Sequence, residues 1–224
     1  MKLLLIRHAI AAGNAEKRML GQLDVPLTLE GQQQAQQLGQ FLHAYSWQPT
    51  HLYCSPLQRA VQTLRILRDC NNKPISTLPI QRSTALLEIN TGVLQGLTWS
   101  EAEEQQPDLC EALLSSQEWI AVPGGESRQA CCDRTHQFIQ TLYTQHQNSD
   151  RLWVISHGGI LPYLIAAILD TPQVWEIKTL NTALFEFELD LDHLHKSNGV
   201  QSNLALCQIL QFNDRPHLSS EGSG

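Results

Sequence analysis

The chain has 224 residues, with 15 Lys plus Arg against 22 Asp plus Glu, so its formal net charge at pH 7 is −7. With 42% apolar residues it is long enough to bury a core, which excludes a disordered chain. The acidic balance and the lack of a Lys/Arg run argue against a nucleic-acid-binding surface. The longest apolar stretch, 160–169, is about half of the roughly 20 residues that a membrane span needs.

The six cysteines follow no C-x-x-C spacing that would indicate a zinc site. A signal peptide is not expected, because Arg7 and His8 follow only a short apolar run. We therefore expect reduced thiols in a cytoplasmic protein. We also expect a single domain over residues 1–218 and a disordered tail over residues 219–224.

In the first half of the chain, residues 3–6 predict a buried strand. Thr28 can cap a helix that has apolar residues at spacings of three and four. Residues 52–54 predict a second short strand, after which Ser55 as cap and Pro56 at the first position predict another helix. Residues 75–80 predict a strand that Pro79 restricts to an edge.

In the second half, Pro107 separates two short predicted helices, and Ser127 begins a longer one. Four consecutive apolar residues at 152–155 are typical of a strand covered on both faces. The remaining predicted elements are a very apolar helix over 160–169 and two strands over 184–189 and 204–210, with a turn at 198–199.

Alternating strands and helices predict an α/β fold, a three-layer α/β/α sandwich with a largely parallel central sheet. No helix is expected between the last two strands, so we expect an antiparallel strand pair at one edge. Ligands of such folds bind beyond the carboxyl ends of the strands. Polar residues follow three predicted strands there: Arg7 and His8, the segment 55–59, and His157 with two glycines.

Taken alone, each of these clusters also has an ordinary structural explanation that involves no function. A histidine can simply bond a local carbonyl, and Arg59 can be a surface arginine. Together they place two guanidinium groups and two imidazoles at one sheet edge, beside glycines that let a ligand approach the backbone. Because guanidinium forks match phosphate oxygens, the sequence predicts an anion pocket.

The order and spacing of these segments resemble the histidine phosphatase superfamily, also called phosphoglycerate mutase-like. The resemblance covers roughly residues 3–160. Its segments are 5–8 (LIRH) with Asn14, 21–28 (GQLDVPLT) with Gly31, 55–60 (SPLQRA) with Thr63, 87–89 (LEI) with Gly92 and Gly96, 124–127 (GGES) and 156–159 (SHGG).

The resemblance implies that His8 is a nucleophile that attacks phosphorus and forms a phosphohistidine. Glu88 would protonate the leaving alkoxide and then deprotonate the attacking water. Arg7, Arg59 and His157 would hold the phosphoryl oxygens. The substrate-binding positions would also include Asn14, Gln22, Gly158 and His217.

One position departs from the family pattern, which has glycine after the Arg-His pair where this chain has Ala9. An alanine would be strained if the site needs a positive φ. The Glu-Thr pair that often follows in the family is replaced by Ile10 and Ala11, so the rim of the pocket is expected to differ from the family pattern. We predict no metal and no cofactor, because clustered arginines neutralise the phosphate, and we interpret the acidic and histidine-containing segment 190–195 as a polar turn.

Three functions remain open: a phosphatase for a small phosphomonoester, a phosphoglycerate mutase-type enzyme, and a non-catalytic phosphate-binding regulatory protein. The mutases of the family usually carry a longer insertion than the 36 residues between Glu88 and Gly125, and commonly have Trp where this chain has Gly13. Both points favour a phosphatase. The intact set of five chemical positions argues against the non-catalytic binder.

The tail 213–218 resembles that of metal-independent phosphoserine phosphatases, in which His217 or Arg215 would meet a substrate carboxylate. Phosphoserine is therefore the first substrate to consider, although a sugar phosphate, α-ribazole phosphate or phosphohistidine on a protein would undergo the same chemistry. We expect a small phosphorylated metabolite as partner, and neither nucleic acid nor a membrane. A homodimer is left open.

Overall fold

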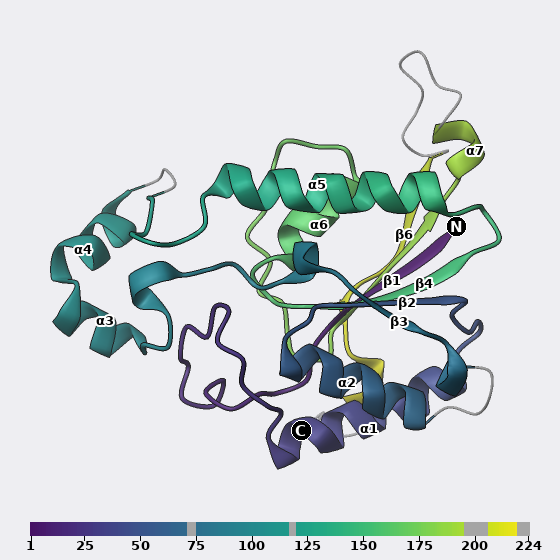
Figure 1. Ribbon diagram of the computed structural model, residues 1–224, viewed down its shortest axis with the longest axis horizontal. Helices are drawn as coiled ribbons and strands as arrows, with labels where there is room; N and C mark the ends of the chain where they lie inside the picture. The colour runs from purple at the N-terminus through teal and green to yellow at the C-terminus, as the bar shows by residue number, and fades with distance from the viewer. Residues whose placement is uncertain (71–74, 117–119, 195–205, 219–224) are drawn as a thin grey trace, which may run out of the picture.

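The computed structural model describes residues 1–70, 75–116, 120–194 and 206–218 (Figure 1). A six-stranded sheet with the order β3-β2-β4-β1-β5-β6 forms the centre. Its strands are β1 (Lys2–Arg7), β2 (His51–Cys54), β3 (Ile80–Arg82), β4 (Arg151–Ser156), β5 (Leu184–Leu189) and β6 (Cys207–Asp214). Strands β1 to β4 are parallel, whereas β5 is antiparallel to β1 and β6 is antiparallel to β5. The predicted largely parallel sheet with an antiparallel pair at one edge is confirmed.

Helices cover both faces of this sheet, which gives the predicted three layers (Figure 1). On one face lie α1 (Leu29–His43) and α2 (Gln58–Asp69), and on the other lie α5 (Arg128–Gln145) and α6 (Leu161–Ile168). The short helices α3 (Trp99–Gln105) and α4 (Pro107–Ser115) lie away from these layers, whereas α7 (Leu191–Leu194) places Leu191 in the core on the α5 side.

The alternation of side chains along the central strands explains why both faces are covered. In β1, Leu3 and Leu5 pack in the core beneath α5 and α6, whereas Leu4 and Ile6 pack beneath α1 and α2. All four side chains are fully buried. A strand buried on both faces reads as a continuous apolar run, which is how this strand could be predicted.

Two helix starts were predicted correctly from their caps. The Thr28 hydroxyl accepts a hydrogen bond from the Gly31 amide, and the Ser127 hydroxyl accepts one from the Ala130 amide. A third predicted start is wrong: α2 begins at Gln58 without a side-chain cap, so Ser55 and Pro56 precede the helix. Ser55 is used elsewhere, as described below.

The strand predicted over 75–80 is misplaced, although β3 does lie at an edge of the sheet as predicted. Residues 75–77 form a 3₁₀ helix and the strand β3 begins at Ile80, directly after Pro79, which cannot donate to a strand ladder. Strand β6 runs over Cys207–Asp214, so it extends past the predicted end at 210, and the start of the predicted strand at 204–205 lies outside the described residues. The segment after Asp190 forms the one-turn helix α7 rather than a polar turn, and Asp190 accepts hydrogen bonds from the Asp192 and His193 amides. The expectation of no helix between the last two strands is therefore wrong, although β5 and β6 do pair antiparallel. The turn at 198–199 and the tail 219–224 lie outside the described residues.

Within the described ranges, no helix combines the length and the apolar character that crossing a membrane would require. All six cysteines fall in those ranges, and none of them forms a disulfide.

Candidate active site

The sheet topology brings the predicted chemical residues to one edge. Arg7 ends β1 and pairs in register with Ser156, the last residue of β4, while Cys54 at the end of β2 pairs with Ile155. Because these three strands are parallel neighbours, the residues that follow them meet at their carboxyl ends. His8, Ser55 and His157 all lie there.

His8 is held as a neutral imidazole. Its side chain is 3% exposed, and its Nδ1 lies 2.7 Å from the backbone carbonyl oxygen of Ala9. A carbonyl only accepts, so Nδ1 carries the hydrogen and Nε2 keeps a lone pair. Burial, followed by the positive charges of Arg59 and Arg7, holds the pKa of His8 well below its ordinary value. The ring is therefore ready to act as a nucleophile through Nε2.

His157 is the second buried imidazole, with its ring centroid 4.9 Å from that of His8. Its Nδ1 accepts a hydrogen bond from Nε of Arg59 at 3.2 Å, which assigns the ring hydrogen to Nε2. That Nε2 lies 2.7 Å from the Ser55 hydroxyl oxygen and donates to it. Burial is the main cause that lowers the pKa of His157 well below its ordinary value, and the positive charges of Arg59 and Arg7 act in the same direction.

The two arginines are anchored by backbone carbonyls rather than by carboxylates. Arg59, which is 1% exposed, donates to the carbonyl oxygens of Leu23 at 2.6 Å and Gly21 at 2.7 Å. Arg7 donates through Nη1 to the Thr179 carbonyl at 2.6 Å, while its buried Nε has no hydrogen-bond partner. Neutral anchors leave the positive charge of both groups available to an anion.

Glu88 is tied to the same turn as His157. Its carboxylate oxygens accept hydrogen bonds from the backbone amides of Ile89 at 2.9 Å and Gly159 at 3.0 Å. A Cβ at Gly159 would lie 2.7 Å from Oε1 of Glu88, so a larger residue there would displace the carboxylate. The structure thus brings together all five residues predicted to carry the chemistry: Arg7, His8, Arg59, Glu88 and His157.

The other predicted positions lie around this cluster in different ways. Asn14 accepts from the Ala11 amide at 2.8 Å and so closes its own loop. Gln22 donates its side-chain amide to the Glu88 carbonyl at 3.0 Å, which positions Glu88. At Gly158, a Cβ would lie 3.1 Å from Cζ of Arg7, so this glycine lets the guanidinium lie against the backbone.

His217 is connected to the cluster through Thr182. Its Nε2 is 2.9 Å from the Thr182 hydroxyl oxygen, and the Thr182 amide donates to the Arg7 carbonyl at 3.2 Å. Burial, followed by the nearby Arg215 charge, lowers the pKa of His217 to about 4. Contact of His217 with a substrate carboxylate remains a prediction.

The backbone at Ala9 is not strained. An alanine in place of the family's glycine would be strained only if φ were positive there. Ala9 is not among the non-glycine residues with positive φ, and it is fully buried. Its amide donates to the Thr63 hydroxyl at 3.1 Å, and that hydroxyl donates to the Arg59 carbonyl at 2.7 Å. Thr63 therefore links the loop after β1 to the first turn of α2.

Sequence reasoning missed several residues that hold the site. Ser55 was interpreted as a helix cap, although its position directly after a strand end was a usable signal. Three residues in irregular chain before β5 contact Arg7 or His8. Thr179 accepts through its carbonyl, Asn181 donates through its side-chain amide, and Thr182 donates through its backbone amide. No periodicity or motif in this chain points to such contacts.

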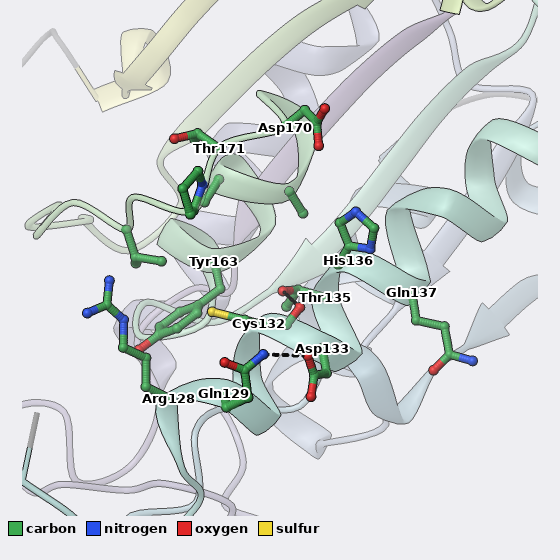
Figure 2. A pocket seen from close by; sticks show the side chains of 14 residues that line it. Arg128, Gln129, Cys132, Asp133, Thr135, His136, Gln137, Tyr163, Asp170 and Thr171 are labelled. Carbon is green, nitrogen blue, oxygen red and sulfur yellow. Dashed lines mark hydrogen bonds between the residues drawn. The ribbon is translucent and has the colours of Figure 1, made fainter. Parts of the chain in front are cut away.

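A separate hollow of about 900 Å³ lies between α5, α6 and the chain that follows α6 (Figure 2). Arg128, Cys132, His136 and Tyr163 are among the residues that line it. It shares no residue with the cluster around His8. The chemistry predicted from the sequence therefore belongs to the sheet edge and not to this hollow.

Comparison with known proteins shows the family to which the chain is similar. The family model of the histidine phosphatase superfamily (branch 1) matches residues 3–198. A metal-independent phosphoserine phosphatase of Arabidopsis thaliana is 30% identical over 99% of this chain and 84% of its own, and phosphoglycerate mutase-like protein 4 of the same plant is 30% identical over 90% of both chains. The α-ribazole phosphatase of Shigella flexneri matches 85% of this chain and 91% of its own, with a TM-score of 0.72 and 27% identity.

Proposed function

Because the chain belongs to the histidine phosphatase superfamily and is a phosphoric monoester hydrolase by its relatives, we propose that it hydrolyses a small phosphomonoester through a phosphohistidine on His8. One observation carries this proposal. His8 is a buried neutral imidazole with a lone pair on Nε2, beside the guanidinium groups of Arg7 and Arg59.

The reaction proceeds in two displacements at phosphorus. First, Nε2 of His8 forms a P–N bond while the P–O bond to the leaving alkoxide breaks, and Glu88 supplies the proton that the alkoxide takes up. A water molecule then attacks phosphorus and gives its proton to Glu88. The P–N bond breaks, its electron pair returns to Nε2, and inorganic phosphate leaves.

The surrounding charges suit this transfer. Arg7 and Arg59 stabilise the negative charge on the phosphoryl oxygens, which is the main protein contribution to phosphoryl transfer. Burial, together with the same charges, lowers the pKa of His8 and so keeps it deprotonated and nucleophilic. No metal ion is needed for either role in this scheme.

Phosphoserine is the leading substrate of this proposal. Support comes from the phosphoserine phosphatase relative, whose similarity extends over nearly the whole chain, and from the C-terminal segment with Arg215 and His217. We favour hydrolysis over mutase-type transfer because only 36 residues separate Glu88 from Gly125, where the mutases of the family usually carry a longer insertion.

A trapping experiment tests the mechanism. Wild-type protein mixed with radiolabelled phosphoserine and quenched in alkali should carry label that is acid-labile and alkali-stable, and His8→Ala should carry none. A panel that includes phosphoserine and 3-phosphoglycerate separates the alternatives. Transfer between phosphoglycerates without net hydrolysis would indicate a mutase, whereas phosphate binding without turnover on any ester would indicate a non-catalytic protein.

A further inference from the structure

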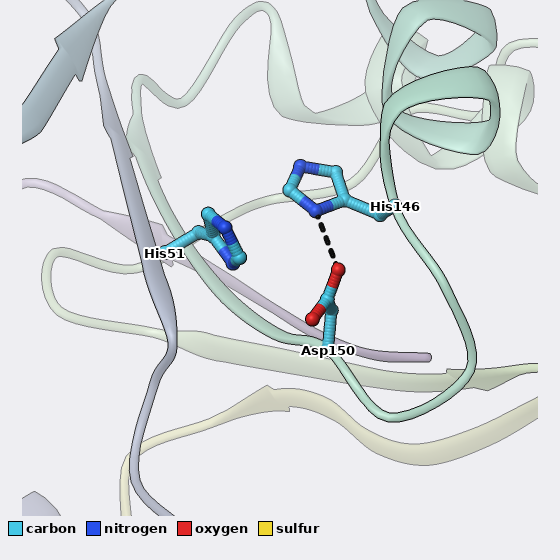
Figure 3. A group of neighbouring side chains, drawn as sticks. All are labelled: His51, His146 and Asp150. Atoms are coloured by element: carbon cyan, nitrogen blue, oxygen red, sulfur yellow. Dashed lines mark hydrogen bonds and ion pairs between the residues drawn. The ribbon is translucent and has the colours of Figure 1, made fainter.

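Three side chains of metal-ligating type meet at the amino ends of the strands, at the opposite end of the sheet from His8. They are His51 at the start of β2, His146 directly after α5, and Asp150 directly before β4 (Figure 3). One ligand atom from each lies within 4.8 Å of the other two. The two imidazole rings and the carboxylate face a common space in Figure 3.

The hydrogen bonds of His51 leave its Nε2 free to bind an ion. The Thr50 hydroxyl donates its hydrogen to the Arg151 carbonyl at 3.1 Å, so it accepts from Nδ1 of His51 at 2.9 Å. Nδ1 therefore carries the ring hydrogen and Nε2 carries a lone pair. Metal-binding histidines are usually oriented in this way, by a hydrogen bond from the nitrogen that does not bind the metal.

His146 has the same kind of support. Its Nδ1 lies 2.9 Å from Oδ2 of Asp150, and its Nε2 lies 2.8 Å from the Tyr53 hydroxyl. A tyrosine hydroxyl both donates and accepts, so it can hold either tautomer of the imidazole. When Nδ1 binds an ion, the ring hydrogen resides on Nε2 and is donated to Tyr53.

The local charges favour a cation, apart from the N-terminal ammonium of Met1, which also interacts with Asp150. The carboxylate of Asp150 contributes a negative charge, and His146 follows the carboxyl end of an 18-residue helix, where the helix dipole is negative. Arg151 adjoins Asp150 in sequence, but its side chain lies on the opposite face of the sheet. Side chains alternate along a strand, and the next residue, Leu152, lies on the α5 face. The Asp150 side chain is 16% exposed, which gives an ion access from solvent.

We propose that His51, His146 and Asp150 bind one zinc ion, with water as the fourth ligand. Two imidazoles and one carboxylate are a ligand set that Zn²⁺ takes in tetrahedral geometry, in which neighbouring ligand atoms are about 3.4 Å apart. Side-chain movements of about 1 Å from the separations in this structure bring the three atoms to that spacing. The ion joins the starts of β2 and β4 to the end of α5.

This ion departs from the expectation that the protein has no metal, yet it takes no part in the proposed reaction. It lies at the amino ends of the strands, whereas His8 and His157 lie at their carboxyl ends. Its consequence is structural, because an ion that binds the folded state and not the unfolded chain raises the melting temperature with its concentration.

The test measures metal binding directly. Protein treated with EDTA and dialysed is titrated with Zn²⁺ in competition with a chelating dye, and with Co²⁺ for the visible absorption of a tetrahedral site. Because His8 and His157 could also take up zinc, the titration is repeated in His8→Ala. We expect one equivalent of tight zinc and a tetrahedral cobalt spectrum in both proteins.

Variants then locate the ion. His51→Ala and Asp150→Asn should weaken zinc binding at least about 100-fold and remove the zinc-dependent rise in melting temperature. Tyr53→Phe should weaken it about tenfold by removing the outer hydrogen bond. His193→Ala is the matched control, because His193 and Asp190 form an exposed pair at 2.6 Å that no second histidine joins in the described part of the chain. It should bind zinc as the wild type does.

Two results would overturn the proposal. One is zinc binding that is lost in His8→Ala and retained in His51→Ala, since the metal would then be in the phosphoryl site. The other is the absence of stoichiometric zinc or cobalt binding in a wild-type protein that is folded by circular dichroism, which would make the cluster a purely structural hydrogen-bond network.

Discussion

The Nε hydrogen of Arg59 is donated to Nδ1 of His157 across 3.2 Å. This bond fixes the tautomer of His157. It also occupies Nε of Arg59, while the two terminal nitrogens of the guanidinium bond the carbonyls of Leu23 and Gly21. Arg59 therefore connects the loop 21–23 to the turn after β4. A lysine has no planar fork with which to make these contacts.

Arg59→Ala should lower kcat/KM by roughly a hundredfold to a thousandfold, as expected for loss of one group that stabilises the transition state. Arg59→Lys should lose less, because it keeps the charge. Steady-state kinetics on phosphoserine measure both. If Arg59→Ala changes kcat by less than about threefold, Arg59 is not part of the reaction site.

Gly159→Ala should impair catalysis through Glu88. The added Cβ would lie 2.7 Å from Oε1 of Glu88 and force the carboxylate to move, and a displacement of that size can cost about a hundredfold in rate. The backbone of Gly159 does not have a positive φ, so the variant should fold. In the double variant with Glu88→Gln, the second change should add little. Losses that multiply fully would show that Gly159 acts independently of Glu88.

The pH dependence of stability should follow from the two buried imidazoles. The pKa of His8 and the pKa of His157 are both lowered, mainly by burial, so the unfolded chain binds more protons than the folded protein below about pH 6.5. The free energy of unfolding should therefore fall as the pH falls from 7 to 5.5. Each histidine contributes a slope of at most about 1.4 kcal/mol per pH unit.

Urea unfolding at several pH values measures this slope. His8→Asn can still donate to the Ala9 carbonyl but cannot titrate, so its slope should be smaller than that of the wild type by the share of one histidine. His217, whose pKa is lowered to about 4, acts in the same direction in both proteins. A free energy of unfolding that is constant between pH 7 and 5.5 would contradict the assignment of neutral imidazoles.

EDTA should leave the initial rate unchanged, because the positive charge of the phosphoryl site comes from Arg7 and Arg59. The proposed zinc ion is a separate matter, since its removal should lower the melting temperature without changing turnover. A rate that falls on chelation and returns with added metal would show that the phosphoryl site itself uses an ion.

The spatial grouping of residues that directly follow strands could be predicted from the sequence. Arg7, His8 and His157 could be placed together because each follows a short apolar run, and parallel strands end at one edge. Ser55 could not be assigned, because its hydroxyl had two competing partners: the amides of a helix start and an imidazole that lies 102 residues further along the chain. The cluster of His51 with His146 was not predicted, since it depends on how the end of one helix packs against a strand start.

Glu88→Gln separates proton transfer from binding. Glutamine is nearly the same size as glutamate, and its amide oxygen can still accept a hydrogen bond from the Gly159 amide, which bonds Glu88 at 3.0 Å. Phosphate affinity should therefore stay close to that of the wild type. An alkyl ester such as phosphoserine needs an acid to protonate its leaving oxygen, whereas p-nitrophenyl phosphate releases a stable anion and needs that help less.

The variant should lose more rate on phosphoserine than on p-nitrophenyl phosphate, by about tenfold or more, and the general-acid limb of its pH–rate profile should disappear. Glu88→Asp is the matched control, since it keeps an acid but shortens the side chain. It should lose rate on both esters in similar proportion. Equal losses of Glu88→Gln on the two esters would show that Glu88 only shapes the pocket, because removal of a proton donor must affect most the leaving group that needs the proton.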